Sequence, residues 1–149
     1  MAREERYPQT LGQLLELVVV LNGDMTQSLG RDGLTVSRAS VLWQLRYRGP
    51  VTQRTLADAL GVSARTVTGL IDGLVATGFV TREPHPTDRR ATLVTFTPHG
   101  ARTVRRLERE QDEFTRILFA DLSDRQFDGF ARGLGHVLSQ IKQHLPSTP

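Results

Sequence analysis

The most informative part of this chain is residues 51–78, which read VTQRTLADALGVSARTVTGLIDGLVATG. Two apolar helical faces stand out in it, a short one and a longer one. Their members are Leu56, Ala57 and Leu60 in the first, and Val67, Leu70, Ile71, Leu74 and Val75 in the second. Gly61 lies between them, where a glycine can take the positive φ that closes a helix, and Gly78 ends the second helix. Two short helices joined by a tight turn predict a helix-turn-helix unit.

Hydroxyl residues mark the expected helix starts. Thr52 and Ser63 precede the two helices of this unit, and their side chains can accept a hydrogen bond from the first helical turn. Thr97 followed by Pro98 predicts the start of a long helix that runs to about residue 120. Ser123, with Gln126 three residues later, forms a capping box for a last helix.

A β-hairpin is expected directly after the helix-turn-helix. Residues 79–83 (FVTRE) and 91–96 (ATLVTF) have strand character, and the second run is rich in β-branched residues. The polar segment 84–90 between them, with two prolines, is the expected tip. A helix-turn-helix followed by such a hairpin is a winged helix.

Long amphipathic helices flank this unit, so the expected fold class is mainly α with a small β part (α+β). Residues 10–29 form the first helix, and Thr35 or Ser37 caps a second that runs to about Arg48. We expect residues 35–97 to form the winged helix-turn-helix DNA-binding domain. We expect residues 10–34 and 98–145 to form a helical dimerisation region of the same compact chain, because a second subunit would bury the apolar stripes of the first and last helices. The alternative is that these stripes pack only against their own chain.

Composition and charge narrow the class further. The 149 residues are 38% hydrophobic, which suits one compact domain, and they include no cysteine, so neither a disulfide framework nor a thiol switch is available. No apolar run approaches the length of a membrane span, and the N-terminus lacks a signal peptide's apolar region, so we expect a cytoplasmic protein without a membrane partner. Residues 46–109 carry 11 arginines against five acidic residues, a net charge of +6. Such a basic segment is typical of a polyanion-binding surface, although an arginine-rich solvated surface has the same composition.

Several motifs together resemble the MarR (multiple antibiotic resistance regulator) family. The helix-turn-helix residues 56–74 are similar to those of that family. The run Gly78-Phe79-Val80-Thr81-Arg82, then Asp88-Arg89-Arg90, then Leu93, Thr97 and Gly100, looks like its wing signature. The resemblance covers residues 10–145 and implies a homodimeric, double-stranded-DNA-binding transcriptional regulator, a repressor released by a small molecule, on a palindromic operator.

Candidate DNA contacts follow from helix faces and from this resemblance. The recognition helix, residues 63–77, presents its non-apolar face to the major groove. By resemblance, the wing, residues 84–90, enters the minor groove through Arg90 braced by Asp88, while Arg89 reaches phosphate. The candidate residues are Ser63, Arg65, Thr66, Thr68, Asp88, Arg89 and Arg90. The simpler alternatives are that Ser63 is only a cap, that Thr66 is only a helix surface residue, and that Asp88 and Arg90 form an ordinary surface ion pair.

Gly69 departs from the family, which often has arginine at that position. Gly73 lies one turn later, and each glycine costs about 1 kcal/mol of helix propensity relative to alanine. Two interpretations stay open: neutral drift on a solvent face, or a close approach of the helix backbone to DNA.

An effector site is implied by the resemblance where the dimer helices meet the winged helix. Trp43, Arg46 and Tyr47 share one face of the second helix, and an aromatic floor with a guanidinium suits a small aromatic acid. The alternative is that Trp43 and Tyr47 are core residues and that Arg46 extends to solvent.

Two other classes of protein fit this sequence less well. An enzyme is disfavoured because the four histidines show no metal-binding spacing, and because no phosphate loop or nucleophile elbow is present. We therefore expect no catalytic residue, metal or cofactor. The second rival is a winged-helix protein-interaction module, which the arginines of the predicted recognition helix and wing disfavour.

Overall fold

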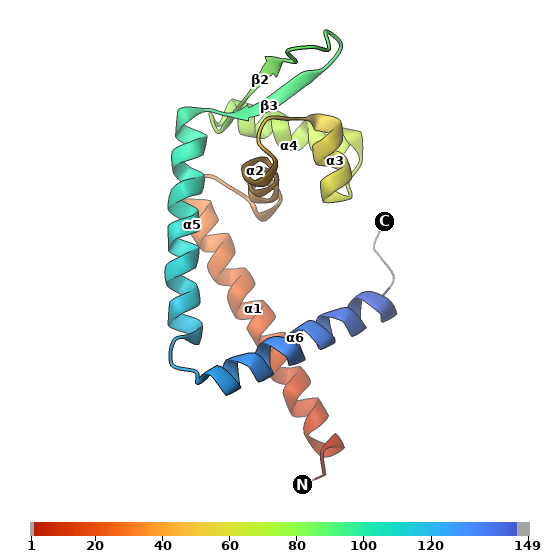
Figure 1. Ribbon diagram of the computed structural model, residues 1–149, viewed down its shortest axis with the longest axis vertical. Helices are drawn as coiled ribbons and strands as arrows, with labels where there is room; N and C mark the ends of the chain where they lie inside the picture. The colour runs from red at the N-terminus through yellow and green to blue at the C-terminus, as the bar shows by residue number, and fades with distance from the viewer. Residues whose placement is uncertain (1, 146–149) are drawn as a thin grey trace. The chain divides into compact units, whose positions relative to one another are not determined.

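The computed structural model describes residues 2–145 and is mostly helical (Figure 1). In chain order its elements are η1 (Glu4–Arg6), α1 (Tyr7–Arg31), α2 (Val36–Arg48), β1 (Val51–Thr52), α3 (Gln53–Leu60), α4 (Ala64–Ala76), β2 (Val80–Pro84), β3 (Thr92–Phe96), α5 (Pro98–Phe119) and α6 (Asp124–His144). The chain divides into two compact units between Val104 and Arg105, so that α1 belongs to the same unit as the winged helix. The predicted winged helix-turn-helix with long flanking helices is confirmed.

The core of the first unit lies where α2, α3 and α4 meet the sheet. Most of its fully buried side chains lie on one face of these helices, as the apolar spacing predicts, and the others lie at Phe79 and on the strands. The fully buried side chains include Val41, Leu42, Leu45, Leu56, Val67, Ile71, Leu74, Phe79, Val80 and Val94. Burial of this face fixes which side of α4 remains in contact with solvent.

The predicted caps are present at the helix starts of this unit. Thr35, rather than Ser37, caps α2 by accepting from the backbone N–H of Arg38, and Thr52 caps α3 in the same way. At the end of α3, Gly61 takes the left-handed conformation with φ 65°, and the backbone N–H of Val62 donates to the carbonyl of Ala57. This turn sets the direction in which α4 leaves α3.

The sheet has three strands rather than the two expected. Strand order is β1-β3-β2, with both pairs antiparallel. β2 and β3 form the predicted hairpin, in which Val80 pairs with Phe96 and Pro84 with Thr92. The added strand β1 pairs Val51 with Val94. Two residues are too short to show the alternation that reveals a strand, so the sequence pattern missed β1.

A tight joint connects the base of the wing to α5. The backbone N–H of Thr97 donates to the carbonyl of Phe79, and the Thr97 hydroxyl donates to the carbonyl of Gly78. The same Thr97 oxygen accepts from the backbone N–H of Gly100, which makes Thr97 the predicted N-cap of α5. The segment that follows α4 is therefore attached to the first turn of α5.

α1 begins earlier and ends later than the expected 10–29, and it leaves much of its apolar surface exposed. Leu11, Leu15 and Val18 are each more than half exposed.

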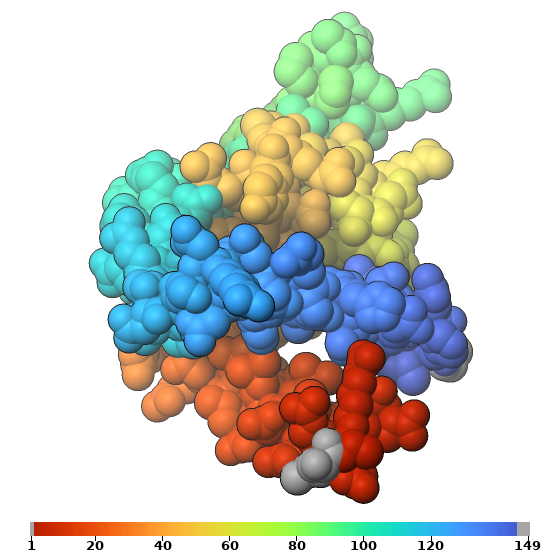
Figure 2. All heavy atoms as spheres, turned by 60° about the horizontal axis from the view of Figure 1, so that its bottom comes forward, coloured from red at the N-terminus to blue at the C-terminus, as the bar shows by residue number. Residues whose placement is uncertain are grey.

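In the second unit, Ser123 and Gln126 form the predicted capping box of α6, and Phe119 packs edge-on against Phe127 with ring centroids 5.4 Å apart. Figure 2 shows α6 in blue, with its side chains at the surface along the helix.

Exposed apolar side chains also line α6. Each of them is between about two-fifths and three-fifths accessible to solvent. They are Phe127, Phe130, Leu134, Val137, Leu138, Ile141 and Leu145. Within the described residues no single helix is long and apolar enough to cross a membrane; only α3 and α4 taken together meet that test, and they are bent by 114°.

Candidate nucleic-acid interface

The outward face of α4 carries the first group of candidate residues. Val67, Ile71 and Leu74 are buried and hold the helix against the core. The predicted contact residues Arg65, Thr66 and Thr68 are all exposed on the remaining surface. The burial pattern thus leaves polar and cationic groups on the side of α4 that faces away from the protein.

The hydroxyl groups at the start of α4 differ in what they can still donate. Ser63 accepts from the backbone N–H of Thr66 at 3.1 Å, so it is the N-cap. Its oxygen also lies 2.9 Å from the Thr66 hydroxyl oxygen, to which it donates. The proton of Ser63 is therefore used within the protein, whereas Thr66 accepts here and keeps its own proton for another acceptor.

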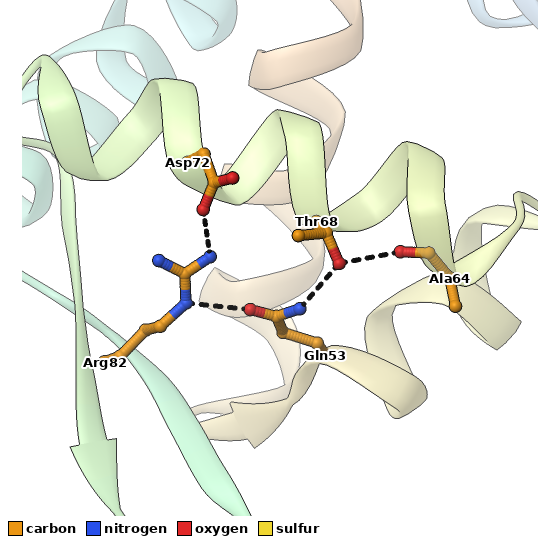
Figure 3. Close-up of polar contacts among 5 residues, drawn as sticks. All are labelled: Gln53, Ala64, Thr68, Asp72 and Arg82. Carbon is orange, nitrogen blue, oxygen red and sulfur yellow. Dashed lines mark hydrogen bonds and ion pairs between the residues drawn. The ribbon is translucent and has the colours of Figure 1, made fainter.

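A polar network joins α3, α4 and β2 beside this face (Figure 3). Nε of Arg82 donates to Oε1 of Gln53 at 2.8 Å, and Nη2 of Arg82 lies 2.6 Å from Oδ1 of Asp72. Nε2 of Gln53 donates to the Thr68 hydroxyl oxygen at 3.2 Å. Thr68 in turn donates to the carbonyl of Ala64 at 2.8 Å. One guanidinium on the wing strand thus fixes side chains from both helices of the helix-turn-helix.

The wing tip is organised by hydrogen bonds to its own backbone. Oδ1 of Asp88 accepts from the backbone N–H of Arg90 at 3.0 Å, so Asp88 holds the Arg90 main chain rather than its guanidinium. Nδ1 of His85 accepts from the backbone N–H groups of Asp88, at 3.0 Å, and Thr87, at 3.2 Å. Arg89 and Arg90 are both exposed. A compact turn therefore presents two guanidinium groups to solvent.

The two unusual glycines of α4 have different surroundings. Gly69 is exposed, and a Cβ built on it would meet nothing within 4 Å. Gly73 is half-buried beneath Arg38, and a Cβ there would lie 2.5 Å from the Nη2 atom of that side chain. The Arg38 guanidinium from α2 covers Gly73. Gly73 therefore lies neither on an open solvent face nor at a surface that DNA can approach closely.

The candidate effector residues on α2 are not gathered in one enclosed site. Trp43 is half-buried, whereas Arg46 is exposed and Tyr47 is 86% exposed. Tyr47 is therefore not a core residue of this unit. Among residues 2–145, no group of three or more histidine, aspartate or glutamate side chains is arranged to hold a metal ion.

Sequence reasoning missed three residues that shape this surface. Gln53 and Arg82 form the network around Thr68, and His85 supports the wing tip. Gln53 and Arg82 are 29 positions apart, which no single-element spacing can relate. Spacing along the chain does not single out His85, because histidine is not one of the side chains whose presence signals a capped turn.

Comparison with known proteins agrees with this architecture. A family model described as "MarR family" matches residues 34–92. The uncharacterized HTH-type transcriptional regulator YwoH of Bacillus subtilis is 34% identical over 99 residues, which are 66% of this chain and 72% of that protein. The multiple antibiotic resistance protein MarR of Salmonella typhimurium is 35% identical over 68 residues, 46% of this chain and 47% of that protein. The match thus spans about half the length of that relative.

Solved structures show the same fold. Wild-type MarR from E. coli in its apo form has a TM-score of 0.65 and 26% identity, and the match covers 86% of this chain and 96% of that one. A mutant of S. aureus MepR bound to an oligodeoxyribonucleotide has a TM-score of 0.63 and 22% identity, with 88% and 97% covered.

The fold and the exposed face of α4 define a protein of the winged helix-turn-helix class, and YwoH, of which the match covers 72%, is named as an HTH-type transcriptional regulator. The chain belongs to the MarR family.

Proposed function

We propose that this chain is a sequence-specific regulator that binds double-stranded DNA, with α4 in the major groove and the wing in the minor groove. The observation that carries the proposal is the presence of exposed cationic and hydroxyl groups on two projecting elements of one compact unit. These groups are Arg65 and Thr66 on α4, and Arg89 and Arg90 on the wing. A helix fits the major groove, and narrow minor grooves attract arginine. The DNA-bound MepR mutant shares the fold.

Each side chain has a distinct expected role. Arg65, near the start of α4, reads guanine or holds a phosphate. Thr66 donates its unused proton to a phosphate oxygen, while Ser63 serves mainly as the cap that orders the turn. Arg90 enters the minor groove from a backbone that Asp88 fixes, and Arg89 contacts the phosphate chain. The protein thus positions itself by phosphate contacts and obtains specificity from base edges.

A second copy of the chain completes this arrangement in our proposal. The exposed apolar residues of α1 and α6 form stripes that a lone chain leaves in water, at a cost of about 25 cal/mol for each Å² of apolar surface. A symmetric dimer would cover them and would place two recognition helices about 34 Å apart, one turn of DNA. The expected operator is therefore palindromic.

The decisive experiment is a salt titration of binding to genomic DNA fragments. Contacts to phosphates release counterions, so the logarithm of the binding constant should fall linearly and steeply as the logarithm of the salt concentration rises. Footprinting on the DNA that flanks the protein's own gene would then locate an operator. A flat salt dependence would contradict DNA binding and would favour a protein-interaction module.

The proposed regulation is repression in the cytoplasm, relieved by a small aromatic acid. Trp43, Arg46 and Tyr47 are the candidate ligand contacts on α2, and the exposed Tyr47 is accessible to a ligand. A ligand acts only if it favours one spacing of the recognition helices over another. Calorimetry with a panel of aromatic acids on wild type and Arg46→Ala tests this: binding that is unchanged in the variant places the site elsewhere.

A further inference from the structure

The network in Figure 3 has only one possible arrangement of its protons. A guanidinium has donors and no acceptor, so the atom of Gln53 that faces Arg82 must be the amide oxygen. The amide nitrogen of Gln53 therefore faces Thr68 and donates to its hydroxyl oxygen. Arg82 is itself held in place by Asp72, at 2.6 Å. The direction of every hydrogen bond from Arg82 to Thr68 follows from the chemistry of the arginine.

This direction determines what Thr68 can offer to DNA. Its hydroxyl oxygen accepts from Gln53, and its proton goes to the carbonyl of Ala64, so no proton is left for a phosphate or a base. The side chain is nevertheless exposed on the outward face of α4. With the hydroxyl proton and one lone pair used within the protein, the γ-methyl group is the apolar part of this exposed side chain that can contact a base.

Gln53 also restricts where that methyl group lies. A threonine in a helix divides between two χ1 rotamers, because its hydroxyl can reach backbone carbonyls in more than one way. The methyl and the hydroxyl turn together about the same bond, so the donor from Gln53 selects one rotamer and one methyl position. Thymine is the base that displays a methyl group in the major groove, and a threonine methyl packs well against it.

We infer that Thr68 is a specificity residue that reads a thymine methyl group, and that Gln53 and Arg82 are the positioning residues that aim it. This inference rests on the proposed function, because it assumes that α4 enters the major groove. The two threonines of α4 then have different roles. Thr66 keeps a proton that it can donate to DNA, and Thr68 presents a methyl group.

Replacement of thymine by uracil tests the inference, because uracil lacks only the methyl group. Duplexes are first selected by the wild-type protein from a random-sequence pool, and each thymine of the selected half-site is then replaced in turn. One position should lose roughly fourfold in affinity, the worth of one buried methyl-sized group. Thr68→Ser should abolish this uracil penalty, and Thr68→Val should retain it. The matched control Thr66→Ser should leave it unchanged.

Double variants separate positioning from a general structural effect. Gln53→Ala or Arg82→Ala should reduce the uracil penalty to about twofold, as expected if Thr68 then divides between two rotamers. Valine is nearly fixed in one rotamer in a helix, so Gln53→Ala should not change the penalty in the Thr68→Val background.

Three results would overturn the inference. They are the absence of a uracil penalty at every position, a penalty that persists in Thr68→Ser, and an equal effect of Gln53→Ala in both backgrounds. Salt-dependent DNA binding in any of these cases would leave the proposed function intact. If no duplex is selected at all, both the inference and the proposed function fail.

Discussion

Gly100 approaches the carbonyl oxygen of Phe79 so closely that a Cβ built on Gly100 would lie 1.9 Å from that oxygen. The contact joins the first turn of α5 to the residue that precedes β2. Thr97 reinforces it, since its backbone N–H donates to the same Phe79 oxygen and its hydroxyl donates to the carbonyl of Gly78. A side chain larger than hydrogen at position 100 would collide with a backbone atom. Backbone atoms cannot move away by a change of rotamer, as a flexible side chain can.

Gly100→Ala should therefore lower the free energy of unfolding by about 1–3 kcal/mol, the usual cost of overpacking a tight site. Chemical denaturation followed by circular dichroism measures this change. Gly69→Ala is the matched control, because a Cβ there meets nothing within 4 Å. The control should raise stability by up to about 1 kcal/mol through helix propensity. Equal stability of wild type and Gly100→Ala would show that the backbone at Phe79 and Gly100 can move apart at little cost in free energy.

His85→Ala should weaken DNA binding by about fivefold, because the tip loses the acceptor of two backbone N–H groups, each worth about 0.5–1.5 kcal/mol. His85→Asn should retain most of the affinity, since an asparagine oxygen can accept in a similar place. Nitrogen NMR should find His85 in the tautomer protonated on Nε2, with Nδ1 as the acceptor. Protonation on Nδ1 would contradict this account of the tip.

Arg90→Ala should reduce operator affinity by tenfold or more, as expected when a charged hydrogen-bonding group worth about 1.5–3 kcal/mol is removed. The melting temperature should not change, because Asp88 holds the Arg90 backbone and the side chain is exposed. Arg125→Ala removes the same charge from α6 and serves as the control. A folded Arg90→Ala variant with wild-type affinity would exclude the wing from DNA recognition.

Arg65→Ala should relax sequence preference by about 1–3 kcal/mol at one position of each half-site. The reason is that a guanidinium near the start of α4 can form two parallel hydrogen bonds to guanine, which no other base accepts in the same way. Arg65→Lys keeps the positive charge but lacks the forked pair of N–H donors, so it should also lose the preference for guanine. If all sequences weaken equally, Arg65 contacts only phosphate.

Leu134→Glu should convert a dimer into a monomer at micromolar concentration, because it places a charge in the apolar stripe of α6. Light scattering on wild type and variant measures this directly. Gln143→Glu adds the same charge on the opposite face of that helix and should leave the dimer intact. A monomeric wild-type protein would show that the stripes are covered in some other way.

Periodicity and capping chemistry predicted most of the winged helix. The apolar spacing of α4 correctly placed Val67, Ile71 and Leu74 in the core, and Ser63 caps the helix as expected. Of the other two residues of that predicted face, Leu70 is half-buried and Val75 is exposed. These features depend on residues a few positions apart, for which helix geometry fixes the spatial relation. The apolar spacing of α4 also predicted the candidate interface, because the residues that are not on the buried face of the helix must lie on its exposed face.

Contacts between elements were beyond that reasoning. The Arg38 guanidinium over Gly73 joins α2 to α4, and the hydrogen bond from Arg82 to Gln53 joins β2 to α3. Such pairs depend on how elements pack, which spacing within one element does not reveal. The expected bracing of the Arg90 guanidinium by Asp88 illustrates the same limit, since the structure gives Asp88 the backbone N–H of Arg90 instead.

Strand order has a consequence for how the protein behaves in a crowded solution. Because β3 lies between β1 and β2, β2 forms an outer edge of the sheet, and its far end is Arg82, Glu83 and Pro84. Strand edges invite pairing with strands of other molecules, and charged side chains and proline discourage it, since proline has no N–H to donate. The hairpin can therefore extend from the protein to reach a target while resisting edge-to-edge aggregation with other copies.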